Sequence, residues 1–197
     1  MLARLFGIVL FRVRCFGRIR IPTTGPVLVC ANHQSFLDPV LVGLACDRRL
    51  NYLARESLFR VPLLRHLISF LDAIPIDREG LSLTGIRESL RRIRGGEMVL
   101  IFPEGTRTAD GRVGPLEPGF CALARRGAVT VLPVGIDGAF DAWPRSTLFP
   151  RPSVIHIHIG EPLTPEFIRQ TANDSLINEL ELRIRQCHTL ARNGRRR

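Results

Sequence analysis

The chain has 197 residues, of which 45% are hydrophobic, so it is long and apolar enough to fold as one domain with a substantial core. This composition excludes a disordered chain. Its 28 basic residues outnumber 18 acidic ones, giving a net charge of +10, and every basic residue is arginine. Because arginine is a planar, permanently charged ligand for phosphate, nucleic acid, anionic membranes and phosphorylated metabolites all remain possible partners.

The N-terminal segment predicts an amphipathic helix. On a helix over residues 1–16, the apolar side chains form one stripe and arginines flank it; the stripe contains Leu2, Leu5, Phe6, Val9, Val13 and Phe16. The longest uninterrupted apolar stretch, Leu5 to Phe11, is too short to cross a bilayer. This pattern is typical of a helix that lies on an anionic membrane surface, with packing of a first helix on the core as the alternative.

Strand-like and helix-like segments alternate along the rest of the chain. Short apolar runs lie near 26–31, 50–54, 73–76, 98–102, 129–136 and 154–159. Helical patterns lie between and after them, at 39–46, 57–71, 81–94, 118–126 and 174–191. The alternation predicts an α/β fold: a single layered domain with a mostly parallel or mixed sheet flanked by helices.

A histidine and an aspartate follow the first of these strands. Asp38 before Pro39 predicts a helix start with Asp38 as the N-cap, so His33 falls in the preceding turn, which can curl back against Asp38. A neutral imidazole can take a proton from a hydroxyl near pH 7, and a carboxylate on its other nitrogen fixes the tautomer. No G-x-S-x-G elbow accompanies them, so we expect the nucleophile to be a substrate hydroxyl. The alternative is a helix cap beside an ordinary loop histidine.

A second polar turn, Phe102–Arg107, follows the run at 98–102. Glu104 and Arg107 flank Gly105, which lets backbone amides approach an anion while Arg107 grips a phosphate bidentately. Arg78 ends a third strand-like run and can add a second guanidinium. The alternative for Glu104 and Arg107 is a solvated turn with a local ion pair, and the alternative for Arg78 is ordinary surface charge.

Two histidines alternate with isoleucines in a late strand-like run. His156 and His158 share one face, but no third histidine, cysteine or carboxylate is spaced to complete a metal site, so we expect no metal. We expect Ile155, Ile157 and Ile159 to face the core and the histidines to face outward or pack among polar groups. Five cysteines, odd in number and without a Cys-x-x-Cys pair, predict reduced core thiols and a cytoplasmic compartment.

Taken together, the motifs resemble those of the glycerolipid acyltransferase family, whose type member is 1-acyl-sn-glycerol-3-phosphate acyltransferase. N-H-x-x-x-x-D matches Asn32, His33 and Asp38, and F-P-E-G-T-R matches residues 102–107 at every position. Two further family segments, a run ending in I-D-R and a V-x-P-V segment, resemble residues 74–78 and 131–134. The four motifs occur in the family's order between about residues 20 and 160.

The chain departs from the family pattern at two positions. Arg55 stands where the family often has the lysine of A-K-x-x-L, which keeps the positive charge but changes its geometry. Asp72 stands where a glycine is common before the I-D-R run. Neither position touches the histidine–aspartate pair.

The resemblance implies a role for each motif. His33 would remove the proton from the free hydroxyl of a lysophospholipid, Asp38 would hold His33, and the oxygen would attack an acyl thioester directly. The glycerol phosphate of the acceptor would be held by Arg78, Glu104, Gly105, Thr106 and Arg107. Pro133 and Val134 would line the acyl-donor side. No cofactor is implied, since acyl-CoA or acyl carrier protein is itself the donor substrate.

The implied product is phosphatidic acid, made from 1-acyl-sn-glycerol 3-phosphate in phospholipid biosynthesis. We expect residues 1–20 to form a membrane-surface segment, 21–192 the catalytic domain and 193–197 a basic tail, with the enzyme peripheral on the cytoplasmic face of the cell membrane.

One alternative keeps the chemistry and uses another lysophospholipid or a lyso-aminolipid as acceptor. A second is a non-catalytic basic protein that binds nucleic acid or anionic lipid. It predicts arginines clustered with aromatic residues, whereas here they are scattered, so no nucleic-acid partner is expected.

Overall fold

The computed structural model describes residues 11–55, 73–76 and 83–196. The predicted helix at 57–71, Arg78 and Asp72 lie outside these residues, as does most of the predicted N-terminal helix. Within them the strands are β1 (Arg14–Phe16), β2 (Val27–Ala31), β3 (Leu50–Arg55), β4 (Ala73–Ile76), β5 (Met98–Ile101), β6 (Thr130–Asp137) and β7 (His156–Ile159). The helices are η1 (Arg18–Arg20), α2 (Asp38–Ala45), α4 (Leu83–Arg94), α5 (Gly119–Gly127), α6 (Ala139–Ala142), α7 (Pro165–Gln170) and α8 (Asn173–Arg195).

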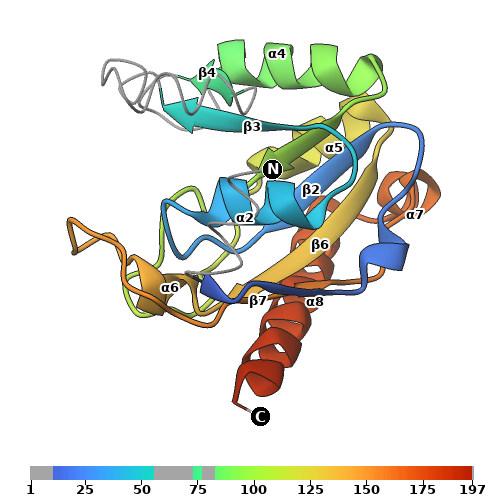
Figure 1. The fold of residues 1–197 in the computed structure, drawn as a ribbon. Coiled ribbons are helices and arrows are strands. Elements are labelled where there is room, and N and C mark those ends of the chain that lie inside the picture. The colour runs from blue at the N-terminus through green and yellow to red at the C-terminus, as the bar shows by residue number, and fades with distance from the viewer. Residues whose placement is uncertain (1–10, 56–72, 77–82, 197) are drawn as a thin grey trace.

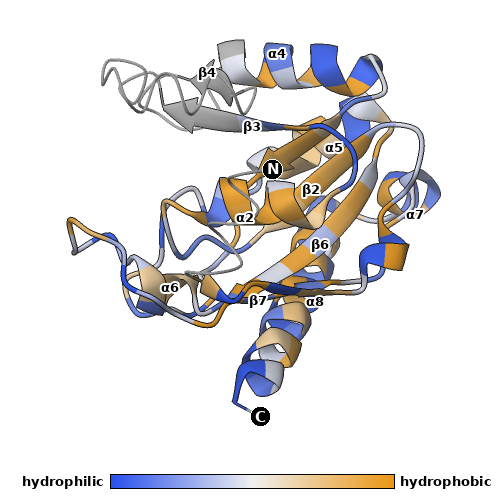
Figure 2. Ribbon diagram, in the orientation of Figure 1, coloured by the Kyte–Doolittle hydropathy of each residue, from blue (hydrophilic) through white to orange (hydrophobic). Residues whose placement is uncertain are grey.

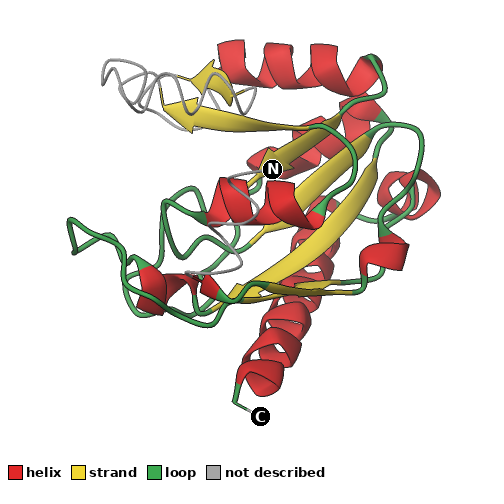
Figure 3. Ribbon diagram, in the orientation of Figure 1, coloured by secondary structure: helices red, strands yellow, loops and turns green. Residues whose placement is uncertain are grey.

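The described strands form one sheet in the order β1-β7-β6-β2-β5-β3-β4 (Figures 1 and 3). The pair β6–β7 is antiparallel, and the other pairs are parallel. The predicted α/β fold with a mixed sheet and flanking helices is confirmed. Strands β2, β5 and β6 are buried almost throughout, which explains why they read as continuous apolar runs rather than alternating ones.

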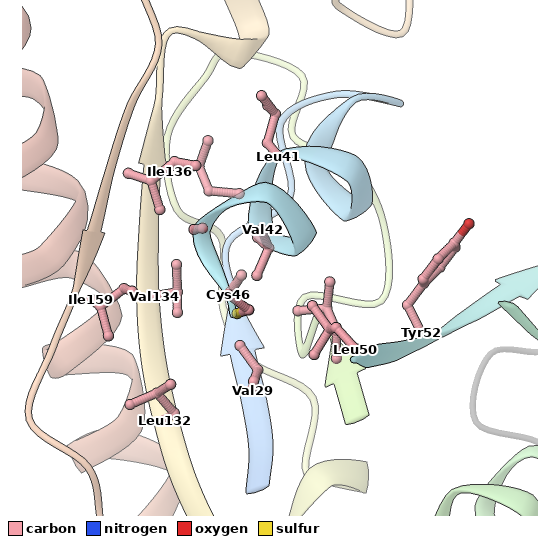
Figure 4. Packing of buried hydrophobic residues seen from close by; sticks show 14 of the residues in the cluster. Val29, Leu41, Val42, Cys46, Leu50, Tyr52, Leu132, Val134, Ile136 and Ile159 are labelled. Atoms are coloured by element: carbon pink, nitrogen blue, oxygen red, sulfur yellow. The ribbon is translucent and has the colours of Figure 1, made fainter. Parts of the chain in front are cut away.

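Two apolar clusters cover the two faces of the sheet. The first packs β2 and β6 against α2, through side chains that include Val29, Val42 and Ile136 (Figure 4). The second packs the opposite face against α4, α5, α7 and α8. Helix α8 approaches β6 most closely at Gly135, where an added Cβ would lie 2.1 Å from the backbone nitrogen of His188. Only glycine fits there, so α8 is held directly against the strand that ends beside the polar turns.

Two expectations about the ends of the chain need correction. Residues 14–16, placed by the apolar stripe on the first helix, form strand β1, which pairs with β7. Residues 193–197 were expected to form a basic tail, but helix α8 continues to Arg195. In β7 the isoleucines are buried as predicted and His158 is partly exposed, whereas His156 is only 2% exposed and contacts the ring of Phe16, so it does not face outward.

Candidate active site

The site begins where β2 ends, at the carboxyl edge that it shares with β5 and β6. Backbone pairing of β2 with β6 stops at Ala31. Asn32 then continues it with its side chain: Nδ2 donates to the Ile136 carbonyl at 3.0 Å, and Oδ1 accepts from the Ile136 amide at 2.7 Å. Asn32 is 1% exposed, so this paired amide fixes the direction in which the chain leaves the sheet toward His33.

His33 and Asp38 meet in the turn, as predicted. Asp38 Oδ2 lies 2.8 Å from His33 Nδ1 and also accepts from the amides of Gln34 at 2.6 Å and Ser35 at 2.7 Å. A carboxylate only accepts, so Nδ1 carries the proton and Nε2 keeps its lone pair. Asp38 is completely buried, whereas the side chain of His33 is 19% exposed. This geometry gives a fixed, accessible base.

The predicted N-cap is wrong. Helix α2 begins at Asp38 itself with Leu37 in the N-cap position, and Leu37 makes no side-chain capping hydrogen bond. The carboxylate of Asp38 points instead into the preceding turn, where its hydrogen bonds to two backbone amides hold the chain in the curl that returns His33 to it. The contact was predicted for the right residues with the wrong helix geometry.

Glu104 ties the hexapeptide to the histidine turn. One carboxylate oxygen accepts from the backbone amide of His33 at 2.8 Å, and the other accepts from that of Gly114 at 2.9 Å. The amide of Thr108 donates to the carbonyl of His33 at 2.8 Å, so the same segment holds both polar groups of the His33 backbone. Burial raises the pKa of Glu104, although the two amide hydrogen bonds oppose the rise. Both carboxylate oxygens of Glu104 therefore already accept hydrogen bonds from backbone amides of the protein. Its predicted contact with the acceptor stays a prediction.

The other residues of the hexapeptide form the surface beside the base. The ring of His33 stacks on Phe102 with centroids 3.9 Å apart. Gly105 is exposed and has a φ of 67°, a left-handed conformation that favours glycine, and Thr106 next to it is also exposed. The guanidinium carbon of Arg107 lies 3.5 Å from the ring centre of Phe36. Arg107 thereby contacts the turn that presents His33.

Pro133 and Val134, predicted to line the acyl-donor side, are buried in β6. Val134 belongs to the apolar cluster beneath α2 and pairs with Ala31 across the sheet. Their role toward the donor stays a prediction, as does that of Arg78, which lies outside the described residues.

A second polar cluster was not predicted from the sequence. Asp137, at the end of β6, lies 3.3 Å from His188, 3.1 Å from Arg192 and 2.6 Å from Arg195, all on α8. Burial raises the pKa of Asp137, but the hydrogen bond from His188 and the charges of both arginines outweigh it and hold the pKa far below its usual range. The only sequence signal was an aspartate ending a predicted strand, because its partners are more than fifty residues away.

Gln34 joins this second cluster to the histidine turn. Its Nε2 donates to the Gly111 carbonyl at 2.8 Å and lies 3.3 Å from His188 Nε2, and its Oε1 accepts from the Phe140 amide at 3.2 Å. The turn that presents His33 is therefore anchored on both sides. Among the described residues, no three His, Cys, Asp or Glu side chains are grouped as metal ligands.

Residues 12–137 match the family described as Acyltransferase, and this span contains both polar turns. The chain belongs to the acyltransferase family. This acyltransferase is 28% identical over 121 residues to a chloroplastic 1-acyl-sn-glycerol-3-phosphate acyltransferase of Brassica napus, covering 60% of the chain and 35% of the relative. It is 26% identical over 152 residues to the 1-acyl-sn-glycerol-3-phosphate acyltransferase of Bacillus subtilis, covering 77% and 73%. The chain thus spans about a third of the plant relative.

A solved structure shares the fold. The crystal structure of the 1-acyl-sn-glycerophosphate acyltransferase PlsC of Thermotoga maritima superposes with a TM-score of 0.80 at 26% identity, covering 95% of this acyltransferase and 78% of that chain. The comparisons confirm the family and the fold expected from the motifs.

Proposed function

We propose that this acyltransferase moves a fatty acyl group from an acyl thioester to the free hydroxyl of 1-acyl-sn-glycerol 3-phosphate, giving phosphatidic acid. The observation that carries the proposal is the partly exposed His33 imidazole, held by the buried Asp38 carboxylate in a turn whose Phe36 ring contacts Arg107. The activities named for the Brassica napus, Bacillus subtilis and Thermotoga maritima relatives support it.

In the proposed reaction, Nε2 of His33 takes the proton from the acceptor hydroxyl as its oxygen attacks the thioester carbonyl. Asp38 stabilises the resulting imidazolium through Nδ1. The tetrahedral intermediate collapses, the carbon–sulfur bond breaks, and His33 returns its proton to the thiolate. No acyl-enzyme forms. General-base assistance contributes roughly 10²–10⁴-fold, so positioning of the two substrates has to supply much of the rest.

Arg107, with Gly105 and Thr106, is the proposed binding site for the acceptor phosphate. The contact with the Phe36 ring restrains the Arg107 guanidinium, and a restrained guanidinium suits bidentate binding of a phosphate. Arg78 is proposed as a second phosphate ligand on the family motif. Acyl-CoA and acyl carrier protein both remain candidate donors, and no cofactor is proposed.

The non-catalytic alternative finds less support in how the arginines are used. Several of them pair with acidic side chains across the described structure, including Arg18 with Asp47, Arg92 with Glu88 and Arg195 with Asp137. An arginine paired with an acidic side chain is less available for contact with phosphate groups, whereas a nucleic-acid-binding surface needs arginines that face the phosphates.

We propose that the enzyme works at the cytoplasmic face of the cell membrane, attached at the surface, because its acceptor is a lipid. No helix among the described residues is long and apolar enough to cross a bilayer.

The test is an assay of the purified chain with lysophosphatidic acid and a set of acyl thioesters, with phosphatidic acid as the measured product. We expect product with the wild type and a loss of about 10²–10⁴-fold with His33→Ala. His158→Ala is the matched control, since His158 lies on β7 outside the site, and it should keep activity. Full activity of folded His33→Ala would refute the mechanism. Acylation of other lysolipids but not of lysophosphatidic acid would move the acceptor to another headgroup.

A further inference from the structure

The loop between α6 and β7 carries an exposed apolar tip that the proposed chemistry does not use. Leu148 is 79% exposed and Phe149 is 73% exposed, although both are large apolar side chains that folding normally buries. Figure 1 shows this loop standing out from the body of the protein, and Figure 2 shows that its outermost part is apolar. Two adjacent apolar side chains on a projection need a partner other than water.

The loop is built to hold this tip out. Its base is closed by a hydrogen bond of 2.7 Å from the Arg151 amide to the Ala142 carbonyl. The indole of Trp143 donates to the Thr147 carbonyl at 3.1 Å, and the amide of Thr147 donates to Pro144 at 3.2 Å. Prolines at 144, 150 and 152 restrict the backbone further. The apolar tip is therefore presented by an ordered turn, and little entropy is lost when it engages a partner.

The loop is also joined to the active-site turn. Ser35 Oγ donates to the Trp143 carbonyl at 2.9 Å. Phe36 is 44% exposed, and the centre of its ring lies 5.5 Å from that of Trp143. The guanidinium of Arg107 contacts the same ring. Phe36 thus links the loop to the proposed phosphate site. The base of the loop is therefore attached to the turn that presents His33.

We propose that the loop Trp143–Arg151 inserts its tip into the surface of an anionic lipid membrane, with Leu148 and Phe149 among the acyl chains. Exposed Arg145 and Arg151 flank the tip and would meet lipid phosphates, and the chain's net charge of +10 favours the same surface. We favour a lipid membrane over a protein as the partner. A narrow two-residue tip between two arginines offers little of the flat area that a protein interface needs.

This proposal rests on the proposed function in one respect: a lipid acceptor lies in a membrane, so membrane contact would give the enzyme access to it. Vesicle binding can be measured without any turnover, so the two proposals fail separately. The contact is also separate from the expected surface segment at residues 1–20.

The chain's single tryptophan, Trp143, reports directly on the loop. Purified full-length protein is titrated with vesicles of phosphatidylglycerol and phosphatidylethanolamine, and with neutral phosphatidylcholine vesicles. We expect a blue shift of Trp143 emission and quenching by brominated acyl chains with the anionic vesicles, and much less with the neutral ones. If the protein cosediments with anionic vesicles while Trp143 emission stays unchanged and unquenched, another segment makes the contact and the proposal is wrong.

Substitution of the tip supplies the second measurement. Leu148→Ser with Phe149→Ser should weaken vesicle binding on the order of tenfold or more and remove the emission shift. The matched control is Leu182→Ser with Leu190→Ser on α8, which also removes two exposed apolar side chains and should leave binding unchanged. Arg145→Gln with Arg151→Gln should weaken binding to anionic vesicles by about fivefold per arginine. Equal binding by the tip variant and the wild type, with the same emission shift, would overturn the proposal.

Turnover then separates this proposal from the proposed function. With a short-chain, water-soluble lysophosphatidate and no vesicles, the tip variant should acylate as fast as the wild type, and with vesicle-borne acceptor it should be slower. If the wild type acylates neither the soluble nor the vesicle-borne acceptor, the proposed function is refuted, but the measurement of Trp143 emission still tests the membrane contact. A tip variant that fails only with acyl carrier protein as donor, and shows no vesicle effect, would assign the tip to a protein partner instead.

Discussion

The protein contains two buried aspartates that each face a histidine, and they are built for different purposes. Asp38 gives one oxygen to His33 and two backbone amides, and the imidazole is 19% exposed. Asp137 faces His188, whose side chain is 8% exposed, and is also paired with Arg192 and Arg195. Asp137 is thus shared between two guanidinium groups and a nearly buried imidazole, and all three partners lie on α8, so this cluster fastens α8 to the end of β6. The two pairs differ in access: the His33 imidazole can be reached by a substrate, whereas the His188 imidazole is nearly buried.

Removing the charge of Asp38 should have the largest effect. Asp38→Asn keeps the size of the side chain but takes the anion away from His33, so kcat should fall by about 10²–10⁴-fold with lysophosphatidic acid. Steady-state kinetics on protein checked by circular dichroism measure this. Asp47→Asn is the control, because Asp47 is exposed and pairs with Arg18 outside the site. A kcat within twofold of the wild type would contradict the role given to Asp38.

Removing the charge of Asp137 should affect stability instead of chemistry. Asp137→Asn leaves two arginines and His188 without their common anion, which should lower the free energy of unfolding by about 2 kcal/mol. Urea unfolding measures the loss, and kcat should stay within a few fold while the protein is folded. A collapse of kcat with unchanged stability would reverse the assignment of the two aspartates.

Glu104→Gln tests whether the hexapeptide glutamate positions the base or holds the acceptor. Glutamine keeps one accepting oxygen and places an NH₂ against the second amide, so His33 should lose its fixed position and kcat should fall about tenfold. KM for lysophosphatidic acid should change little. Glu166→Gln on α7 provides an exposed control. A raised KM with unchanged kcat would show instead that Glu104 binds the acceptor, as the motif alone suggests.

The smallest predicted effect is a pH dependence. The folded-state pKa of Asp137 lies below its ordinary value of 3.8, because hydrogen bonds from His188 and the arginines outweigh burial. A depressed carboxyl pKa stabilises the fold above that ordinary value, and the stabilisation is lost as the pH falls toward the folded value. The difference in unfolding free energy between wild type and Asp137→Asn should therefore be full at pH 7 and smaller at pH 3. A difference that grows on acidification would be inconsistent with this account.

Much of the fold and half of the site were readable from the sequence, for physical reasons. The central strands are buried on both faces, so their apolar runs are unmistakable. The contact of His33 with Asp38 is local, because it joins two residues five positions apart in one turn. Strand β1 was misread as helix because a three-residue edge strand has too few residues to show its own period.

The rest depends on contacts between distant residues. The sheet order places β2 between β5 and β6, and that neighbourhood brings Glu104 to a backbone amide 71 residues earlier in the chain. Arg195 was read as part of a tail, yet it closes an ion pair with Asp137 at 2.6 Å. No local pattern encodes these partners, because each forms only once the sheet and α8 are packed.

The central claim, that His33 and not His188 is the base, is tested most directly by one pair of variants. His33→Ala and His188→Ala are assayed side by side for phosphatidic acid formation, at equal amounts of protein shown to be folded. The account predicts a loss of kcat of about 10²–10⁴-fold for His33→Ala and a change of no more than a few fold for His188→Ala. Retained activity in His33→Ala, or an equal loss in both variants, would contradict it.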